Sequence, residues 1–130
     1  MIKRQIKTHS REDMLDITKI IQEALLESSR MDISAVLVFV PHTTAGVTIN
    51  ENADPDVRTD IIAGLRRLVP MEQGFRHAEG NSDAHIKASL LGSSLMVPVE
   101  NGRLALGTWQ GIYFAEFDGP RNRTVVIKTI

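Results

Sequence analysis

Histidine, hydroxyl, amide and carboxylate side chains are concentrated between residues 42 and 54. This stretch reads His-Thr-Thr-Ala-Gly-Val-Thr-Ile-Asn-Glu-Asn-Ala-Asp and follows a continuous apolar run over residues 35–40. Val47 and Ile49 alternate with polar residues, which is typical of a strand rather than of a solvated loop. The pattern therefore favours polar side chains that point into a cleft or an interface.

Three of the four histidines lie where a binding site could form. His42 follows an expected strand, His77 lies in a long loop, and His85 lies in the first turn of an expected helix. Three neutral imidazoles can bind Zn²⁺ and leave one coordination position open. The spacing matches no compact metal motif, however, so a solvated loop position for His77 and a helix-start role for His85 are simple alternatives.

Two glutamates lie in places that could support chemistry. Glu51 stands between Asn50 and Asn52, and such a string could bind Mg²⁺, orient a phosphate or form a turn. Glu116 lies inside an apolar, aromatic strand, where a free carboxylate is costly unless it is paired. It could be a general base, a partner of a histidine or a residue on the solvated face of an edge strand.

The stretch 107–111 reads Gly-Thr-Trp-Gln-Gly and forms a third polar group. Its glycines let a ligand approach the backbone closely, and Thr108 and Gln110 supply neutral hydrogen bonds. A bulge that interrupts a strand around a buried tryptophan is the structural alternative. Arg121 and Arg123 could hold an anionic substrate or be ordinary turn charges.

Hydrophobic periodicity predicts the elements that must position these groups. Local signals give a helix that begins at Ser10 with a capping-box-like pattern and runs to about Ser28, and a second helix that begins at Asp54-Pro55 and buries one apolar stripe. A third helix is expected from about residue 82 to Gly92. The second helix's stripe comprises Val57, Ile61, Leu65 and Leu68.

The remaining segments read as strands. The expected ranges are 2–8, 32–41, 44–49, 95–99, 103–106, 112–117 and 124–130. Most are linked by short connections, which favours antiparallel pairing. The sequence therefore predicts one α+β domain over residues 1–130, mostly antiparallel, with about three helices.

Composition narrows the function. With 130 residues, 42% of them hydrophobic, the chain can form one substantial core, and its 15 basic and 16 acidic residues nearly cancel. No basic run suggests nucleic acid as a partner, and no apolar run is long enough to span a membrane. With no cysteines, any metal site must use histidines and carboxylates. We expect a soluble protein of the cytoplasm.

Together these motifs resemble the YjbQ family, also called UPF0047, which was long uncharacterised and later linked to a secondary thiamine-phosphate synthase activity. The similarity extends over essentially the whole chain, and the Thr-Ile-Asn-Glu-Asn and Gly-Thr-Trp-Gln strings are its most specific parts. The matching segments are 42–54, 77–80, 84–87, 106–112 and 116–121.

The resemblance implies a homotrimer with a histidine-lined metal site, zinc being the first choice, and a small phosphorylated metabolite as the ligand. The implied reaction couples hydroxymethylpyrimidine diphosphate to thiazole phosphate and releases pyrophosphate, with Mg²⁺ accompanying the diphosphate. A metal-dependent hydrolase or phosphatase and a non-catalytic trimeric binding protein are the alternatives. The metal ligands carried over by position are His42, His77 and His85.

The other site residues have expected roles. Glu51 and Glu116 are the candidate catalytic or orienting carboxylates, and Arg121 is a candidate anion contact. We expect residues 42–54 to form one wall of a composite pocket whose far side is closed by residues 107–111. The remaining substrate-binding candidates are Thr43, Asn50, Asn52, Thr108 and Gln110.

Overall fold

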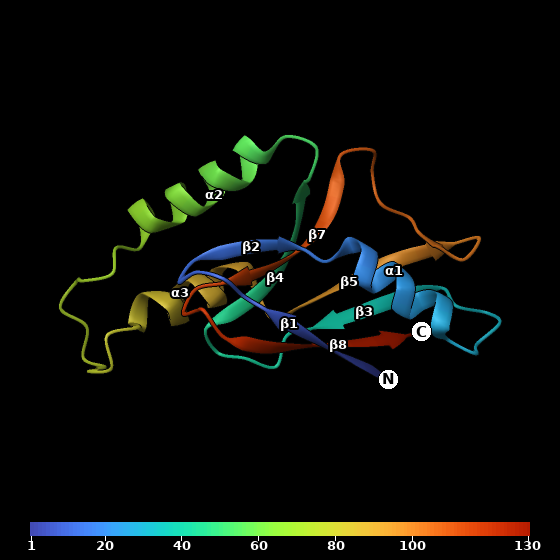
Figure 1. Ribbon diagram of the computed structural model, residues 1–130, viewed down its shortest axis with the longest axis horizontal. Helices are drawn as coiled ribbons and strands as arrows, with labels where there is room; N and C mark the ends of the chain where they lie inside the picture. Colours follow the sequence, from blue (N-terminus) through green and yellow to red (C-terminus); the bar gives the residue numbers. More distant parts are fainter.

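Two antiparallel sheets organise the chain in the computed structural model, which describes residues 1–130 (Figure 1). The larger has the order β1-β8-β3-β5-β6 and the smaller the order β2-β7-β4. The strands are β1 (Ile2–Lys7), β2 (Asp13–Asp16), β3 (Ala35–Phe39), β4 (Ala45–Glu51), β5 (Ser94–Glu100), β6 (Arg103–Leu104), β7 (Gln110–Glu116) and β8 (Asn122–Thr129). The helices are α1 (Thr18–Glu27), α2 (Pro55–Leu68) and α3 (Ser82–Leu91).

The smaller sheet is covered on both faces, which explains why β7 is buried along nearly its whole length. Ile112 and Phe114 point toward the larger sheet and α1, where they join a core of 15 buried residues. Tyr113, Ala115 and Phe117 point the other way, into a second cluster that α2 and α3 cover. Successive strand residues face opposite sides, so one strand can serve two cores.

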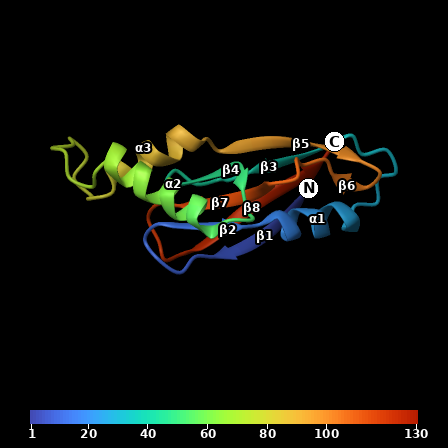
Figure 2. The same ribbon diagram turned by 90° about the horizontal axis from the view of Figure 1, so that it is seen from above.

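The helices lie at different ends of the molecule. Figures 1 and 2 both show α1 at one end of the molecule, near the two termini, and α3 at the other end, where it packs against β4. No helix is long and apolar enough to cross a membrane. The predicted α+β class, antiparallel pairing and three helices are confirmed.

The predicted start of the first helix is wrong. Residues 13–16 form β2, which pairs with β7, and the helix begins only at Thr18. Met14 and Ile17 are both buried, but in different clusters. Their spacing of three residues therefore reflects a strand that turns into a helix, and Asp16, rather than Ser10, accepts the Thr18 N–H bond at 2.9 Å.

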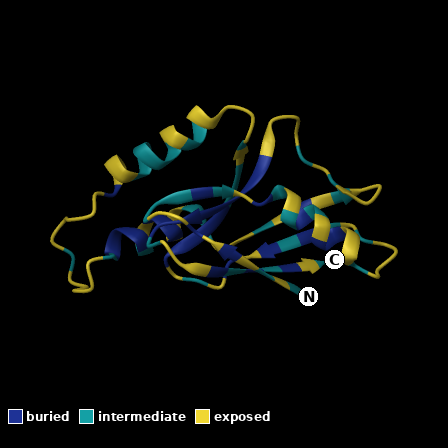
Figure 3. Ribbon diagram, viewed as in Figure 1, coloured by how far each residue is buried: buried dark blue, intermediate teal, exposed yellow.

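The second helix begins as predicted, because the Asp54 side chain accepts the backbone N–H of Asp56 at 2.9 Å. Its expected buried stripe is wrong, however. No residue of α2 is fully buried, and Leu68 is 69% exposed. Only its Ile61, Ile62 and Leu65 pack on the second cluster, so the helix lies partly outside the body of the protein (Figure 3).

Close contact between α3 and β4 supports a stability prediction. A Cβ atom on Gly46 would lie 2.8 Å from the carbonyl oxygen of Gly92, which is backbone and cannot rotate away. We expect Gly46→Ala to lower the free energy of unfolding by about 1–3 kcal/mol, the usual cost of overpacking. Urea denaturation would measure this.

Gly64→Ala is the matched control. A Cβ at Gly64, inside α2, would meet nothing within 4 Å. It should raise stability by about 0.5–1 kcal/mol, because alanine favours helix over glycine. Equal effects of the two substitutions would contradict the close packing of α3 on β4.

Candidate functional site

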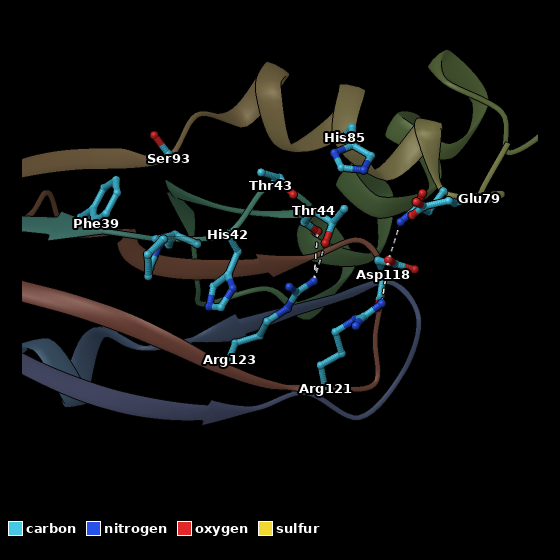
Figure 4. Close-up of a pocket in the computed structure, with 13 residues that line it drawn as sticks. Phe39, His42, Thr43, Thr44, Glu79, His85, Ser93, Asp118, Arg121 and Arg123 are labelled. Carbon is cyan, nitrogen blue, oxygen red and sulfur yellow. Dashed lines mark hydrogen bonds and ion pairs between the residues drawn. The ribbon is translucent and has the colours of Figure 1, made fainter. Parts of the chain in front are cut away.

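A cleft of about 650 Å³ opens where the chain crosses from the larger sheet to the smaller one. The crossing, residues 40–44, links the end of β3 to the start of β4. The cleft is also lined by the start of α3 and by the turn between β7 and β8, so it collects residues from distant parts of the chain (Figure 4). Its polar lining residues are His42, Thr43, Thr44, Glu79, Asn81, His85, Ser93, Asp118, Arg121 and Arg123.

A buried ion pair underlies this cleft. The Arg123 guanidinium donates two hydrogen bonds to the Glu116 carboxylate, which is fully buried. Nη2 of Arg123 also donates to Oγ1 of Thr44 at 2.8 Å, and Oγ1 of Thr8 donates to Glu116 at 2.9 Å. Every charged group is therefore matched by several donors or acceptors, as a buried pair requires.

The pKa of Glu116 reflects these bonds. Burial by itself would raise the pKa, but the hydrogen bonds from Arg123 and from the backbone N–H of Asp118 outweigh it and lower the pKa below 4.5. Glu116 is thus ionised and enclosed. Its position does not suit a general base that must reach a substrate, and it acts here as the counter-ion that fixes Arg123.

A second network of charged side chains, outside the cleft, holds the start of α3. Lys87, only 1% exposed, pairs with Asp83 at 3.0 Å and with Glu12 at 3.1 Å, and Arg11 pairs with Asp83 as well. Burial would raise the pKa of Asp83, but these partners lower it. The network ties α3 to the segment before β2 and so sets where His85 stands.

The three predicted metal ligands are only partly brought together. His42 and His85 line the cleft. The rings of His77 and His85 meet edge to face at 5.4 Å, while Nδ1 of His77 hydrogen-bonds Oγ of Ser82 at 3.0 Å. No three histidine, aspartate or glutamate side chains of the chain form a group that could hold a metal ion. The metal site at His42, His77 and His85 therefore stays a prediction.

The expected composite pocket is wrong within one chain. Residues 107–111 do not line the cleft. Ala45 of β4 pairs with Glu116, whereas Glu51 pairs with Gln110, at the opposite end of the same ladder. Six residues of strand separate these ends by about 20 Å. Of the predicted substrate-binding residues, only Thr43 and Arg121 lie at the cleft, and Asn50, Asn52, Thr108 and Gln110 do not.

Several lining residues were not predicted. Ser93 and Asn81 carry no signal that separates them from ordinary loop and helix-cap residues, whereas Thr44 lies in the stretch 42–54 that was expected to form a pocket wall. Arg123, which the sequence offered as an anion contact or a turn charge, does carry a signal of burial, because Arg123, Val125 and Ile127 alternate along β8 and all point inward. A charged residue among inward-pointing apolar residues of a strand requires a buried partner of opposite charge. Glu116 lies in an apolar strand as well, so the sequence offered it as that partner.

Comparison with known proteins agrees with this fold. The family model described as "UPF0047 protein YjbQ-like" matches residues 2–130. The chain belongs to the YjbQ family. The UPF0047 protein MJ1081 of Methanocaldococcus jannaschii is 56% identical over 100% of this chain and 94% of its own length, and YugU of Bacillus subtilis is 56% identical over 95% and 94%.

Solved structures of relatives have the same fold. A YjbQ-family protein from Clostridium acetobutylicum matches with a TM-score of 0.96 and 53% identity over 100% of both chains. A protein from Sulfolobus solfataricus, described as of unknown function, matches with a TM-score of 0.92 at 28% identity, over 98% of this chain and 94% of its own. The single compact α+β domain is thus a property of the YjbQ family, whose members' names assign no activity.

The buried pair leads to a stability prediction. Glu116→Gln leaves the Arg123 charge enclosed without a counter-ion, which should cost about 3–5 kcal/mol in free energy of unfolding. Urea denaturation at pH 7 would measure the loss. Glu100→Gln, on an exposed strand residue of β5, is the matched control and should change stability by less than about 0.5 kcal/mol. A small effect at Glu116 would contradict the pairing.

The same pair predicts a pH dependence. Because folding lowers the pKa of Glu116, its contribution to stability is complete above the ordinary value of 4.5 and is lost as pH falls toward the folded-state pKa. Protonated Glu116 resembles glutamine. The difference in unfolding free energy between the wild type and Glu116→Gln should therefore shrink below about pH 4.5. A difference that stays constant between pH 7 and pH 3 would contradict this.

Proposed function

We propose that the cleft binds a small phosphorylated metabolite and that the protein is a transferase of the thiamine-phosphate synthase type. The substrates would be hydroxymethylpyrimidine diphosphate and thiazole phosphate, and the products thiamine phosphate and pyrophosphate. The observation that supports this most is the convergence of hydrogen-bond donors from three separate elements on one cleft: Thr43 from the crossing segment, His85 from α3, and Arg121 from the turn before β8.

Two arginines offer donors to a ligand while their charges are already balanced. Arg121 pairs with Asp118 at 2.9 Å and remains 53% exposed. Nη1 of Arg123 makes no hydrogen bond within the chain, whereas Nε and Nη2 do. Nη1 is not fully enclosed, so a ligand can reach it. Both can therefore donate to phosphate oxygens. Donors aimed at the leaving diphosphate stabilise the charge that develops on it as the bond breaks.

Glu79 and Asp118 supply acceptors on the same cleft. Mg²⁺ that enters with the diphosphate would neutralise part of its charge. This ion would belong to the substrate rather than to the protein. The residues of the chain then have modest tasks. Arg121 and Thr43 hold phosphate oxygens, while Glu116 keeps Arg123 in place without touching the substrate.

The homotrimer is part of this proposal. The larger sheet has one face on the core, and its other face is uncovered and carries Leu37, Phe39, Met96 and Val126 on neighbouring strands. Met96 is 57% exposed. Contact with further copies of the chain would cover this apolar surface. The resident zinc and the location in the cytoplasm also remain predictions.

A hydrolase is the second candidate, and one contact favours it. Oγ of Ser82 lies 3.0 Å from Nδ1 of His77, whose Nε2 lies 3.7 Å from Glu79. This order of groups resembles a nucleophile, a base and an orienting carboxylate. Ser82 is only 8% exposed, however, and it does not line the cleft. We therefore rank hydrolysis below transfer.

Kinetics of matched variants test the proposal. Arg121→Gln removes a charged donor, a loss of about 1.5–3 kcal/mol that corresponds to a rise of about 10- to 150-fold in KM for the diphosphate substrate. Arg67→Gln, on the exposed side of α2, should leave KM unchanged. The assay follows both thiamine phosphate formation and phosphate release.

Each outcome distinguishes the candidates. Coupling that weakens only in Arg121→Gln supports the transferase. Phosphate release without coupling, abolished in Ser82→Ala, would support the hydrolase instead. Neither reaction in the wild type, with metabolite binding retained, would leave the non-catalytic binding protein.

A further inference from the structure

His42 occupies the point where β3 leaves the larger sheet. The last pair of the β3–β8 ladder is Phe39 with Val126, and the chain then turns away at Pro41. Two residues along β8, the backbone N–H of Thr124 points to the same edge and donates to Nε2 of His42 at 2.9 Å. The imidazole therefore replaces the carbonyl acceptor that the departing strand no longer supplies.

This bond determines which ring nitrogen carries the proton. Nε2 accepts a hydrogen bond, so its lone pair points at Thr124 and the neutral ring must be protonated at Nδ1. Turning the ring over would set a C–H group against the Thr124 N–H and leave that donor unsatisfied. A doubly protonated ring would set N–H against N–H. Burial and then the charge of Arg123 lower the pKa of His42, which agrees with a neutral ring.

The other nitrogen faces no partner in the chain. Nδ1 of His42 makes no hydrogen bond within the chain. Oδ1 of Asn81 is the only fully enclosed side-chain polar atom without a partner, so Nδ1 of His42 is accessible. His42 is half-buried and lines the cleft beside Arg123 (Figure 4). Its Nδ1–H group is thus open to whatever the cleft binds.

We infer that His42 is a neutral hydrogen-bond donor of the cleft, presenting Nδ1–H to ligand oxygen atoms, and that it is not a metal ligand. A histidine binds a metal through a nitrogen lone pair. The lone pair of Nε2 is engaged by Thr124, and Nδ1 holds the proton. His42 therefore does not fit the role that the resemblance gave it, and a zinc site at His77 and His85 would have to be completed without it.

The oxygen atoms belong to a phosphate or diphosphate if the function proposed above holds, and this part of the inference rests on that function. Nη1 of Arg123 and Nδ1–H of His42 then act as neighbouring donors for one oxyanion. One donor belongs to a charged group that Glu116 balances, and the other is uncharged. The cleft recognises an oxyanion by directed hydrogen bonds rather than by excess positive charge.

Nuclear magnetic resonance of imidazole ¹⁵N-labelled protein at pH 7.5 tests the protonation state directly. The signals that disappear in His42→Gln are those of His42. The amide oxygen of the introduced glutamine can still accept the Thr124 N–H bond, so the variant should fold. We expect a proton on Nδ1 and none on Nε2, with both signals unchanged when ZnCl₂ is added. A proton on Nε2, or zinc-dependent shifts of the His42 nitrogens, would overturn the inference.

Titration with inorganic pyrophosphate separates this inference from the proposed function. We expect the His42 Nδ1–H signal to shift, and His42→Gln to weaken binding about 2- to 12-fold in calorimetry, as for one neutral hydrogen bond. Binding by the wild type that leaves the His42 signals in place would overturn the donor role while the function stands. An absence of binding would overturn the function, and the proton position and zinc response would still decide the role of His42.

Discussion

The buried pair of Glu116 and Arg123 is the interaction on which the cleft depends. It joins β7 of the smaller sheet to β8 of the larger one, and through Thr44 it also holds the crossing segment between them. Enclosing two charges costs several kcal/mol for each ion, and only a full set of hydrogen bonds offsets that cost. Thr8 and the backbone N–H of Asp118 complete this set. The pair can therefore stand only where these segments meet, and that meeting place is the floor of the cleft.

The same pair decides the electrostatic character of the cleft. Because Glu116 balances Arg123 and Asp118 balances Arg121, the cleft has arginine donors but little excess positive charge. The neighbouring guanidinium also disfavours a second cation, which helps to keep His42 neutral. A site of this kind selects an oxyanion by the positions of its oxygens. A highly charged diphosphate would then need its own cation, which accords with Mg²⁺ arriving with the substrate.

The sequence predicted the elements that local chemistry determines. Asp54-Pro55 marks the start of α2 because the cap and the proline act within one turn, and Gly92 ends α3 with a positive φ of 96°. Prediction from the sequence failed where contacts between distant segments determine the structure. Residues 13–16 became a strand only because β7 offers them an edge, and the burial of α2 depends on how far the second cluster extends. His42 does lie at the cleft, but its protonation depends on Thr124, 82 residues away, and no spacing rule reveals that.

The polar residues at the far end of the β4–β7 ladder show a related difficulty. Asn50, Asn52 and Gln110 looked like ligand-binding residues, yet each side chain already has a partner within the chain. Oδ1 of Asn50 accepts the N–H of Glu51, Nδ2 of Asn52 donates to Asp16, and Oε1 of Gln110 accepts the N–H of Gly107. The bonds of Asn50 and Gln110 are local bonds of the kind that stabilise turns at strand ends, and that of Asn52 links two strand ends. All three need the same residue types as a binding site. Thr108 has no such partner. The two groups of polar residues are alike in sequence, and what distinguishes them is their place in the fold, because only the residues near the start of β4 line the cleft.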